Sequence, residues 1–233
     1  MLPALLAVVL IAQGVPATSE LPGADEVVTK MVQHDEERRT TLQGYTGLRR
    51  YALVNSSHHK EAEMVVRVIY HKDGAKEFDV VSSSGWGGAR KHVFPRLLEA
   101  ETEASRPGSP EDSRMTPENY SFSMLRVDQV DDRKTYVLET TPKQQKKYLM
   151  RGTIWVDAED FAIIRMEGEP AKNPSFWIKS VQFGHKYQKV GPFWLAASDS
   201  SVTDVRIFGR TELRVDYFDY VINGATALQV KLP

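Results

Sequence analysis

The chain has 233 residues, a formal net charge of -1 and no cysteine. This length suits one domain with a sizeable core. The near-zero charge excludes a global field that would steer the protein to nucleic acid or anionic lipid. The absence of cysteine excludes disulfides, zinc–thiolate sites and thiol nucleophiles.

The first residues have the pattern of an export signal. Leu2–Ala12 is apolar, and Val15-Pro16-Ala17 offers the small side chains that a signal peptidase reads. The run is too short for a ~30 Å hydrocarbon core, which needs roughly 20 apolar residues. The pattern is typical of a secretory signal peptide, although no Lys or Arg precedes the run. A buried N-terminal helix and an uncleaved anchor are the alternatives. We expect cleavage after Ala17, export to the periplasm, and a single domain over residues 18–233.

One helix and three strands are predicted next. Ala24–Thr41 should be helical, because four apolar residues recur there at helical spacing: Val27, Val28, Met31 and Val32. Strands are expected over residues 45–54, 61–71 and 76–82, and the turn Lys72-Asp73-Gly74 joins the last two as a hairpin. The second strand alternates most clearly, which predicts one buried face.

A second helix is predicted after the strand pattern breaks at Gly85-Trp86-Gly87-Gly88. Arg90–Ala104 returns to helical spacing, with an apolar stripe of Val93, Leu97, Leu98 and Ala104. Three acidic residues are expected to face away from this stripe: Glu99, Glu101 and Glu103. Residues 105–117 are rich in Pro, Ser and Glu without periodicity, which is typical of a mobile loop.

The rest of the chain is predicted to be strands with no helix between them. They are expected near residues 120–124, 136–138, 148–156, 161–166, 176–187, 193–198, 202–207 and 211–221. Short antiparallel steps exclude a βαβ parallel sheet. An apolar sheet face must be covered, and two amphipathic helices are available to cover it. We predict a mainly β (α+β) fold, an open and strongly curved antiparallel sheet or half-barrel of about ten strands. An N-terminal helix and an inserted helix accompany it.

Catalytic motifs do not appear in the sequence. The nucleophile elbow, the zinc-protease helix and the phosphate-binding loop are all missing. Gly85–Gly88 resembles an oxyanion loop but has no paired nucleophile, and a hinge before the helix explains it better. His58 and His59 are adjacent in a polar turn, where neighbours point apart and chelate one ion poorly. We therefore expect neither an enzyme nor a metal site, and no cofactor.

Two charged clusters have a structural and a functional interpretation. Asp157, Glu159 and Asp160 fall where a hairpin turn is needed, and Asp favours turns; calcium binding is the alternative, without the spacing of an EF-hand. The basic segment 143–147 follows Pro142. It is either a solvated loop that discourages edge pairing or a contact with an acidic partner or membrane surface.

The apolar residues carry more information about function than the polar ones. One face of the predicted strands holds large, soft side chains, which are core in a closed barrel and line a cavity in an open one. Such a cavity would suit an acyl chain, because it is apolar and methionine adapts to variable ligands. The predicted cavity residues are Met64, Val66, Val68, Phe78, Val80, Phe122, Met124, Leu138 and Ile154.

The order of elements resembles the LolA/LolB-like outer-membrane lipoprotein-sorting superfamily. A signal peptide leads into an amphipathic helix and then into Tyr45-Thr46-Gly47-Leu48-Arg49-Arg50. Antiparallel strands follow, interrupted by one helix. The hairpin Leu149–Asp157, with Gly-Thr-Ile-Trp-Val-Asp, then runs into Phe161–Arg165. The resemblance covers most of the mature chain.

The resemblance implies an unclosed β-barrel with a helical lid over its apolar face. Arg90–Ala104 is then the lid, with Val93, Leu97 and Leu98 turned to the cavity and the nearby glycines as hinge. The superfamily's carriers hold the lid with an arginine on an early strand, and Arg49 and Arg50 are both candidates.

The expected function is that of a periplasmic, non-enzymatic protein that sequesters lipid or lipoprotein acyl chains. Outer-membrane lipoprotein sorting is its specific form in the superfamily. The expected partners are acyl chains and membrane-associated donor or acceptor proteins, without nucleic acid, and the protein is expected to be a monomer. The alternative is an envelope-stress sensor or scaffold that binds a protein and carries no lipid.

Overall fold

A computed structural model describes residues 21–105, 113–146, 148–172, 178–206, 209–222 and 225–226. The expected signal peptide, residues 1–17, lies outside the described residues, as does most of the expected loop 105–117. Helix α1 spans Ala24–Thr41, as predicted. The inserted helix begins with a π-helical turn, Ala89–Val93, and continues as α2, Phe94–Ala104.

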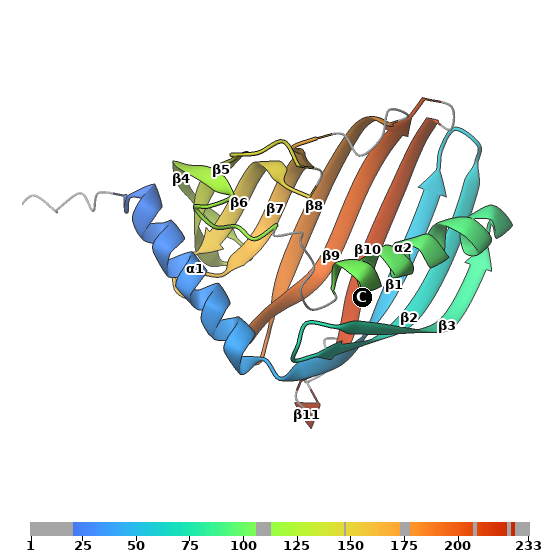
Figure 1. Ribbon diagram of the computed structural model, residues 1–233, viewed down its shortest axis with the longest axis horizontal. Coiled ribbons are helices and arrows are strands. Elements are labelled where there is room, and N and C mark those ends of the chain that lie inside the picture. Colours follow the sequence, from blue (N-terminus) through green and yellow to red (C-terminus); the bar gives the residue numbers. More distant parts are fainter. Residues whose placement is uncertain are drawn as a thin grey trace, which may run out of the picture.

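The strands form one antiparallel sheet in the order β3-β2-β1-β10-β9-β8-β7-β6-β5-β4, with the two-residue β11 paired to β10 (Figure 1). Edges therefore lie at β3 and β4, and the predicted open sheet is confirmed. The strands are β1 Gly44–Asn55, β2 Lys60–His71, β3 Lys76–Gly85, β4 Tyr120–Val130, β5 Arg133–Pro142, β6 Met150–Asp157, β7 Ile163–Pro170, β8 Ile178–Val190, β9 Phe193–Val205, β10 Gly209–Ile222 and β11 Ala225–Thr226.

One strand prediction was wrong. The segments 193–198 and 202–207 were expected as separate strands, but β9 is continuous from Phe193 to Val205. In the structure Asp199 pairs with His185 of β8 on one side and with Val215 of β10 on the other. Ladder pairing on both sides keeps this polar stretch extended.

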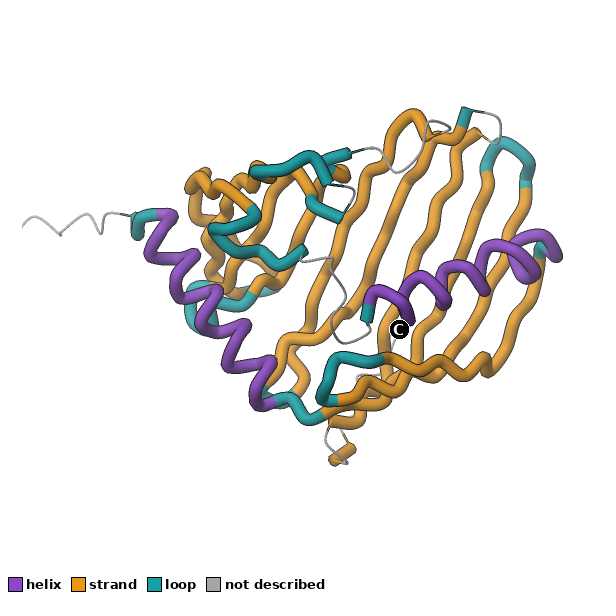
Figure 2. The backbone as a smooth tube through the Cα atoms, in the orientation of Figure 1, coloured by secondary structure: helices purple, strands orange, loops and turns teal. Residues whose placement is uncertain are grey.

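The two helices pack on the same face of the curved sheet, at opposite ends (Figures 1 and 2). Helix α1 buries Val27, Val28 and Met31 against Leu138, Ile154 and Val156 of β5 and β6. The inserted helix buries Ala89 and Phe94 against residues of β1, β2 and β10: Tyr51, Leu53, Ala62, Met64, Val66, Val68 and Val215. Each helix thus has its own core cluster, and the middle of the concave face lies between them.

The junction between β3 and the inserted helix is fixed by Gly85. Its φ is +80°, and a Cβ there would lie 2.4 Å from the carbonyl oxygen of Glu61. The next residue, Trp86, donates its backbone N–H to that same oxygen at 2.7 Å. Only glycine fits this close approach, so the helix leaves the sheet at a defined point.

Candidate functional site: the concave face beneath the inserted helix

The residues predicted to line a cavity lie on the concave face, beneath the two helices. Met64, Val66 and Val68 are buried under the inserted helix, with Phe78 partly buried beside them. Leu138 and Ile154 are buried under α1, where Phe122 and Met124 are partly buried. They form the floor on which the helices pack, and they are absent from the linings of the two pockets described below.

Val80 is placed differently from its neighbours. It pairs with Val66, which puts both on one face, yet 58% of Val80 is exposed. It lies on the edge strand β3, where the register shifts opposite Val65 and Val66. Alternation predicted its face but not its exposure, because burial at an edge depends on what covers it.

The expected lid residues face the sheet. Val93, Leu97 and Leu98 are partly buried against the cluster that contains Met64 and Val66. Phe94, which is 1% exposed, anchors the start of α2 in the same cluster. The apolar stripe predicted for this helix is therefore the surface that contacts the sheet.

Arg49, rather than Arg50, links the sheet to α2. The Arg49 guanidinium donates to the Glu101 carboxylate of α2 at 2.7 Å, and its side chain is only 5% exposed. Arg50 points to the other face, where it pairs with Asp216 at 2.8 Å and stays 47% exposed. The two candidates are distinguished by strand alternation, since neighbouring side chains point to opposite faces.

Glu101 is held by donors from two strands. Besides Arg49, the Tyr51 hydroxyl of β1 donates to it at 3.2 Å and the Lys76 ammonium of β3 at 3.4 Å. This corrects the expectation that Glu101 faces away from the apolar stripe of the inserted helix. Leu97 and Glu101 are four residues apart, a spacing that places side chains on one side of a helix.

Aromatic rings enclose the Arg49 guanidinium. Its carbon lies 4.8 Å from the centre of the Tyr217 ring and 5.4 Å from that of Phe78. Desolvation is the largest effect and lowers the pKa of Arg49, but the Glu101 charge together with Tyr217, Tyr51 and Tyr45 outweighs it, so the net pKa is raised. Desolvation likewise raises the pKa of Glu101, while Arg49 and Lys76 bring it below its ordinary value. Both groups are therefore charged at neutral pH.

A pocket of about 340 Å³ opens beside this ion pair, and we call it the α2 pocket. Its apolar wall is formed by Leu97, Phe183, Leu213 and Val215, and Tyr51, Glu101 and Tyr217 also line it. On its polar side Asp199 accepts a hydrogen bond from the Tyr217 hydroxyl and lies 2.7 Å from the His185 ring nitrogen Nδ1. Burial raises the pKa of Tyr217, so its hydroxyl stays protonated.

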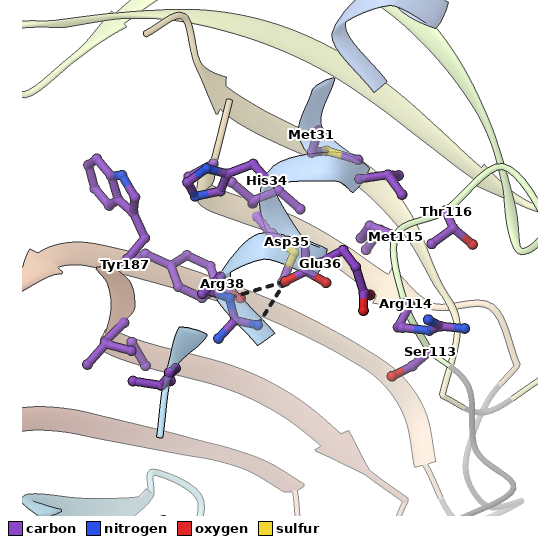
Figure 3. A pocket seen from close by; sticks show the side chains of 18 of the residues that line it. Met31, His34, Asp35, Glu36, Arg38, Ser113, Arg114, Met115, Thr116 and Tyr187 are labelled. Atoms are coloured by element: carbon purple, nitrogen blue, oxygen red, sulfur yellow. Dashed lines mark hydrogen bonds and ion pairs between the residues drawn. The ribbon is translucent and has the colours of Figure 1, made fainter. Parts of the chain in front are cut away.

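A second pocket of about 480 Å³ lies along α1, and we call it the α1 pocket (Figure 3). Met31, His34 and Arg38 of the helix line it, opposite Tyr187 and residues of β9. His34 Nε2 is buried there without a hydrogen-bond partner, whereas Arg38 donates to Asp35 at 2.8 Å. This pocket combines apolar and charged side chains, as the labelled residues in Figure 3 show.

The other polar candidates have structural roles. Asp157, whose side chain is 1% exposed, pairs with Arg133 at 2.7 Å and accepts the backbone N–H groups of Glu159 and Asp160. Arg133 supplies the positive charge in this hairpin. The His58 and His59 turn is closed by Asn55, whose side chain accepts the backbone N–H of His58.

Sequence reasoning named Arg49 as one of two candidate lid arginines but missed its partner Glu101 and the Asp199–His185 pair on the concave face. Arg49 occupies an inward position two residues before Tyr51, and Asp199 and His185 occupy paired inward positions on β9 and β8. A charged residue on the buried face of a strand needs a partner. That requirement was the available signal, but only the folded chain identifies Glu101 as the partner.

Comparisons with known proteins give a family-model match and similarities to solved structures. Residues 109–224 match the model of a family described as an uncharacterized protein. A comparison with curated protein sequences finds no match. The structural similarities include a LolA superfamily protein from Nitrosomonas europaea, at 13% identity and TM-score 0.43, covering 91% of this chain and 96% of that one.

Two further structures are similar over most of their length. A domain from Vibrio parahaemolyticus described as an outer membrane lipoprotein-sorting protein has 11% identity and TM-score 0.48, covering 86% of this chain and 93% of that one. The MucA/MucB complex of Pseudomonas aeruginosa has 11% identity and TM-score 0.30, covering 88% and 98%. At these identities the function has to be argued from this chain's own residues.

Neither helix in the described part of the chain combines the length and the apolar character needed to cross a bilayer.

Proposed function

We propose that the protein is an exported, non-enzymatic carrier that binds lipid acyl chains between its concave face and α2. The observation that carries this proposal is the arrangement of α2: an apolar stripe covers an apolar sheet, beside a 340 Å³ pocket, and one ion pair ties the helix down. The proposal agrees with the fold that the sequence resemblance implies.

Sequestration of apolar surface supplies the binding energy. Removing apolar area from water contributes about 25 cal/mol per Å². A 16-carbon chain at about 0.8 kcal/mol per buried CH₂ gains on the order of 10 kcal/mol before the costs of binding. A whole chain needs more room than the α2 pocket offers, so α2 has to move when the ligand enters. Leu97 and Leu98 then contact the ligand in place of the sheet.

Filling the α2 pocket tests the proposal. Ser201 is a partly buried residue that lines this pocket. The variant Ser201→Phe should abolish uptake of a fluorescent fatty acid while the protein keeps its fold. Gln182→Phe is the matched control, because Gln182 is exposed and precedes Phe183, whose side chain faces the pocket. Unchanged uptake by folded Ser201→Phe would contradict the proposed site.

A protein-binding role is the second candidate, and the sheet edges favour it. Val80 and Val81 are 58% and 55% exposed on edge strand β3, and Leu125 is 48% exposed on edge strand β4. An unpaired edge with apolar side chains can receive an extended peptide. Extraction of purified protein with organic solvent separates the two functions: co-purified lipid supports the carrier, and lipid-free protein with no uptake supports the scaffold.

A further inference from the structure

We propose that the ligand is an anionic amphiphile, whose carboxylate or phosphate head replaces the Glu101 carboxylate on Arg49 when α2 opens. This inference rests on the proposed acyl-chain binding and specifies its ligand class. In the closed protein, Glu101 occupies the position of the ligand head.

The first argument is the burial of Arg49. Its side chain is 5% exposed and lies between the rings of Phe78 and Tyr217. A guanidinium so removed from water is costly without a counter-anion. Glu101 belongs to α2 and leaves with it, whereas Arg49 belongs to the sheet and stays. Opening is therefore easiest when another anion takes the place of Glu101.

The second argument is the set of donors that stays behind. The Arg49 guanidinium, the Tyr51 hydroxyl and the Lys76 ammonium all donate to Glu101, and all three come from strands β1 and β3. Carboxylate and phosphate oxygens both suit such a set, and charge-assisted hydrogen bonds are roughly twice as strong as neutral ones. A neutral head would leave Arg49 without a counter-ion.

The third argument is the pocket next to these donors. Tyr51, Glu101 and Tyr217 line the α2 pocket together with the apolar wall of Leu97, Phe183, Leu213 and Val215. A ligand head at Arg49 therefore has its tail directed along apolar surface. Asp199 on the far side is already bonded to Tyr217 and His185, and its charge disfavours a second anionic group. The site fits one anionic head with an apolar tail.

Calorimetric titration tests the inference with dodecanoate, dodecyl phosphate and dodecanol, each below its micelle concentration, and with acetate and inorganic phosphate as tail-free anions. Glu101→Gln removes the competing charge, so we expect about tenfold tighter binding of both anionic amphiphiles, equal to about 1.4 kcal/mol. Binding of dodecanol gains only the easier opening of α2, so it should tighten less than binding of the anionic amphiphiles. Glu99→Gln is the matched control, because Glu99 is an exposed carboxylate on the same helix.

Arg49→Gln should weaken binding of the two anionic amphiphiles to the level of dodecanol, with Arg50→Gln as its control. If Arg49→Gln does not fold, the titrations of Glu101→Gln and its control Glu99→Gln test the inference without it. Equal binding of dodecanol and dodecanoate, unchanged in Glu101→Gln, overturns the inference and leaves the carrier function intact. Acetate or phosphate binding as tightly as the amphiphiles also overturns it, since the site then needs no tail. Failure of every amphiphile to bind overturns the proposed function as well.

Discussion

Replacing Arg49 by methionine should release α2 from the sheet without unfolding the protein. The guanidinium donates to Glu101 at 2.7 Å and to the Tyr51 hydroxyl at 3.4 Å, and it lies on two aromatic rings. Methionine keeps much of the apolar stem in contact with those rings. The substitution therefore removes the ion pair while it retains most of the packing.

The expected loss can be estimated from these contacts. A hydrogen bond to a charged group contributes about 1.5–3 kcal/mol. The cation–π contacts of Arg49 with Phe78 and Tyr217 lie within the sheet and do not hold α2. Glu101 is 33% exposed, so solvent screening reduces the ion-pair contribution. We expect α2 to lose about 1–2 kcal/mol of docking energy, which raises its opening equilibrium roughly 5- to 30-fold, because about 1.4 kcal/mol is a factor of ten.

Residue-resolved amide hydrogen exchange measures this opening directly. In Arg49→Met the amides of α2 should exchange faster, while those of β5 and β6, beneath α1, should keep their protection. Arg50→Met is the control, because Arg50 pairs with Asp216 on the opposite face of the sheet. Uniform acceleration in helix and strands would refute the reasoning, since Arg49 would then stabilise the whole domain rather than the lid.

Three further predictions follow from the same geometry. Because the pKa of Glu101 lies below its ordinary value of 4.5, its contact with Arg49 is complete above that pH and is lost as the pH falls through the lowered pKa. The protection of the α2 amides relative to the intrinsic exchange rate should therefore be constant above about pH 5 and fall in acid, and protection that falls toward alkaline pH would contradict this assignment. Leu97→Asp should speed release of a bound fluorescent fatty acid in stopped-flow measurements, whereas Arg96→Asp, exposed on the same helix, should not; equal rates would mean that Leu97 does not contact the ligand. Mass-spectrometric sequencing of protein from the envelope should find Thr18 as the first residue, and an intact Met1 there would mean that the apolar segment is an anchor.

Periodicity was sufficient to predict most of the fold. The bounds of α1 follow from four apolar residues at helical spacing, and the buried face of β2 follows from strict alternation. Periodicity failed where tertiary pairing determines the structure. Residues 193–198 and 202–207 were predicted as separate strands, but ladder bonds from β8 and β10 keep β9 continuous through Asp199.

The candidate site was less predictable than the fold, because it depends on contacts between distant segments. The sequence places Arg49 on the buried face of a strand, and only folding brings Glu101, 52 residues away, within 2.7 Å of it. The exposure of Val80 at the sheet edge was not predictable from the sequence either, since Val80 pairs with the buried Val66 yet is 58% exposed. Local sequence patterns predict which face of a strand a side chain occupies. They do not predict which distant residue it contacts there, because that depends on how the whole chain folds.

Native mass spectrometry of the protein purified from its own envelope tests the central claim most directly. The account predicts a population heavier than the polypeptide by the mass of one lipid, which is lost on extraction with organic solvent and restored by adding an acyl-chain ligand. The Ser201→Phe variant, with its pocket filled, should show only the polypeptide mass. A wild-type protein that carries no lipid and gains none when ligand is added would contradict the carrier function.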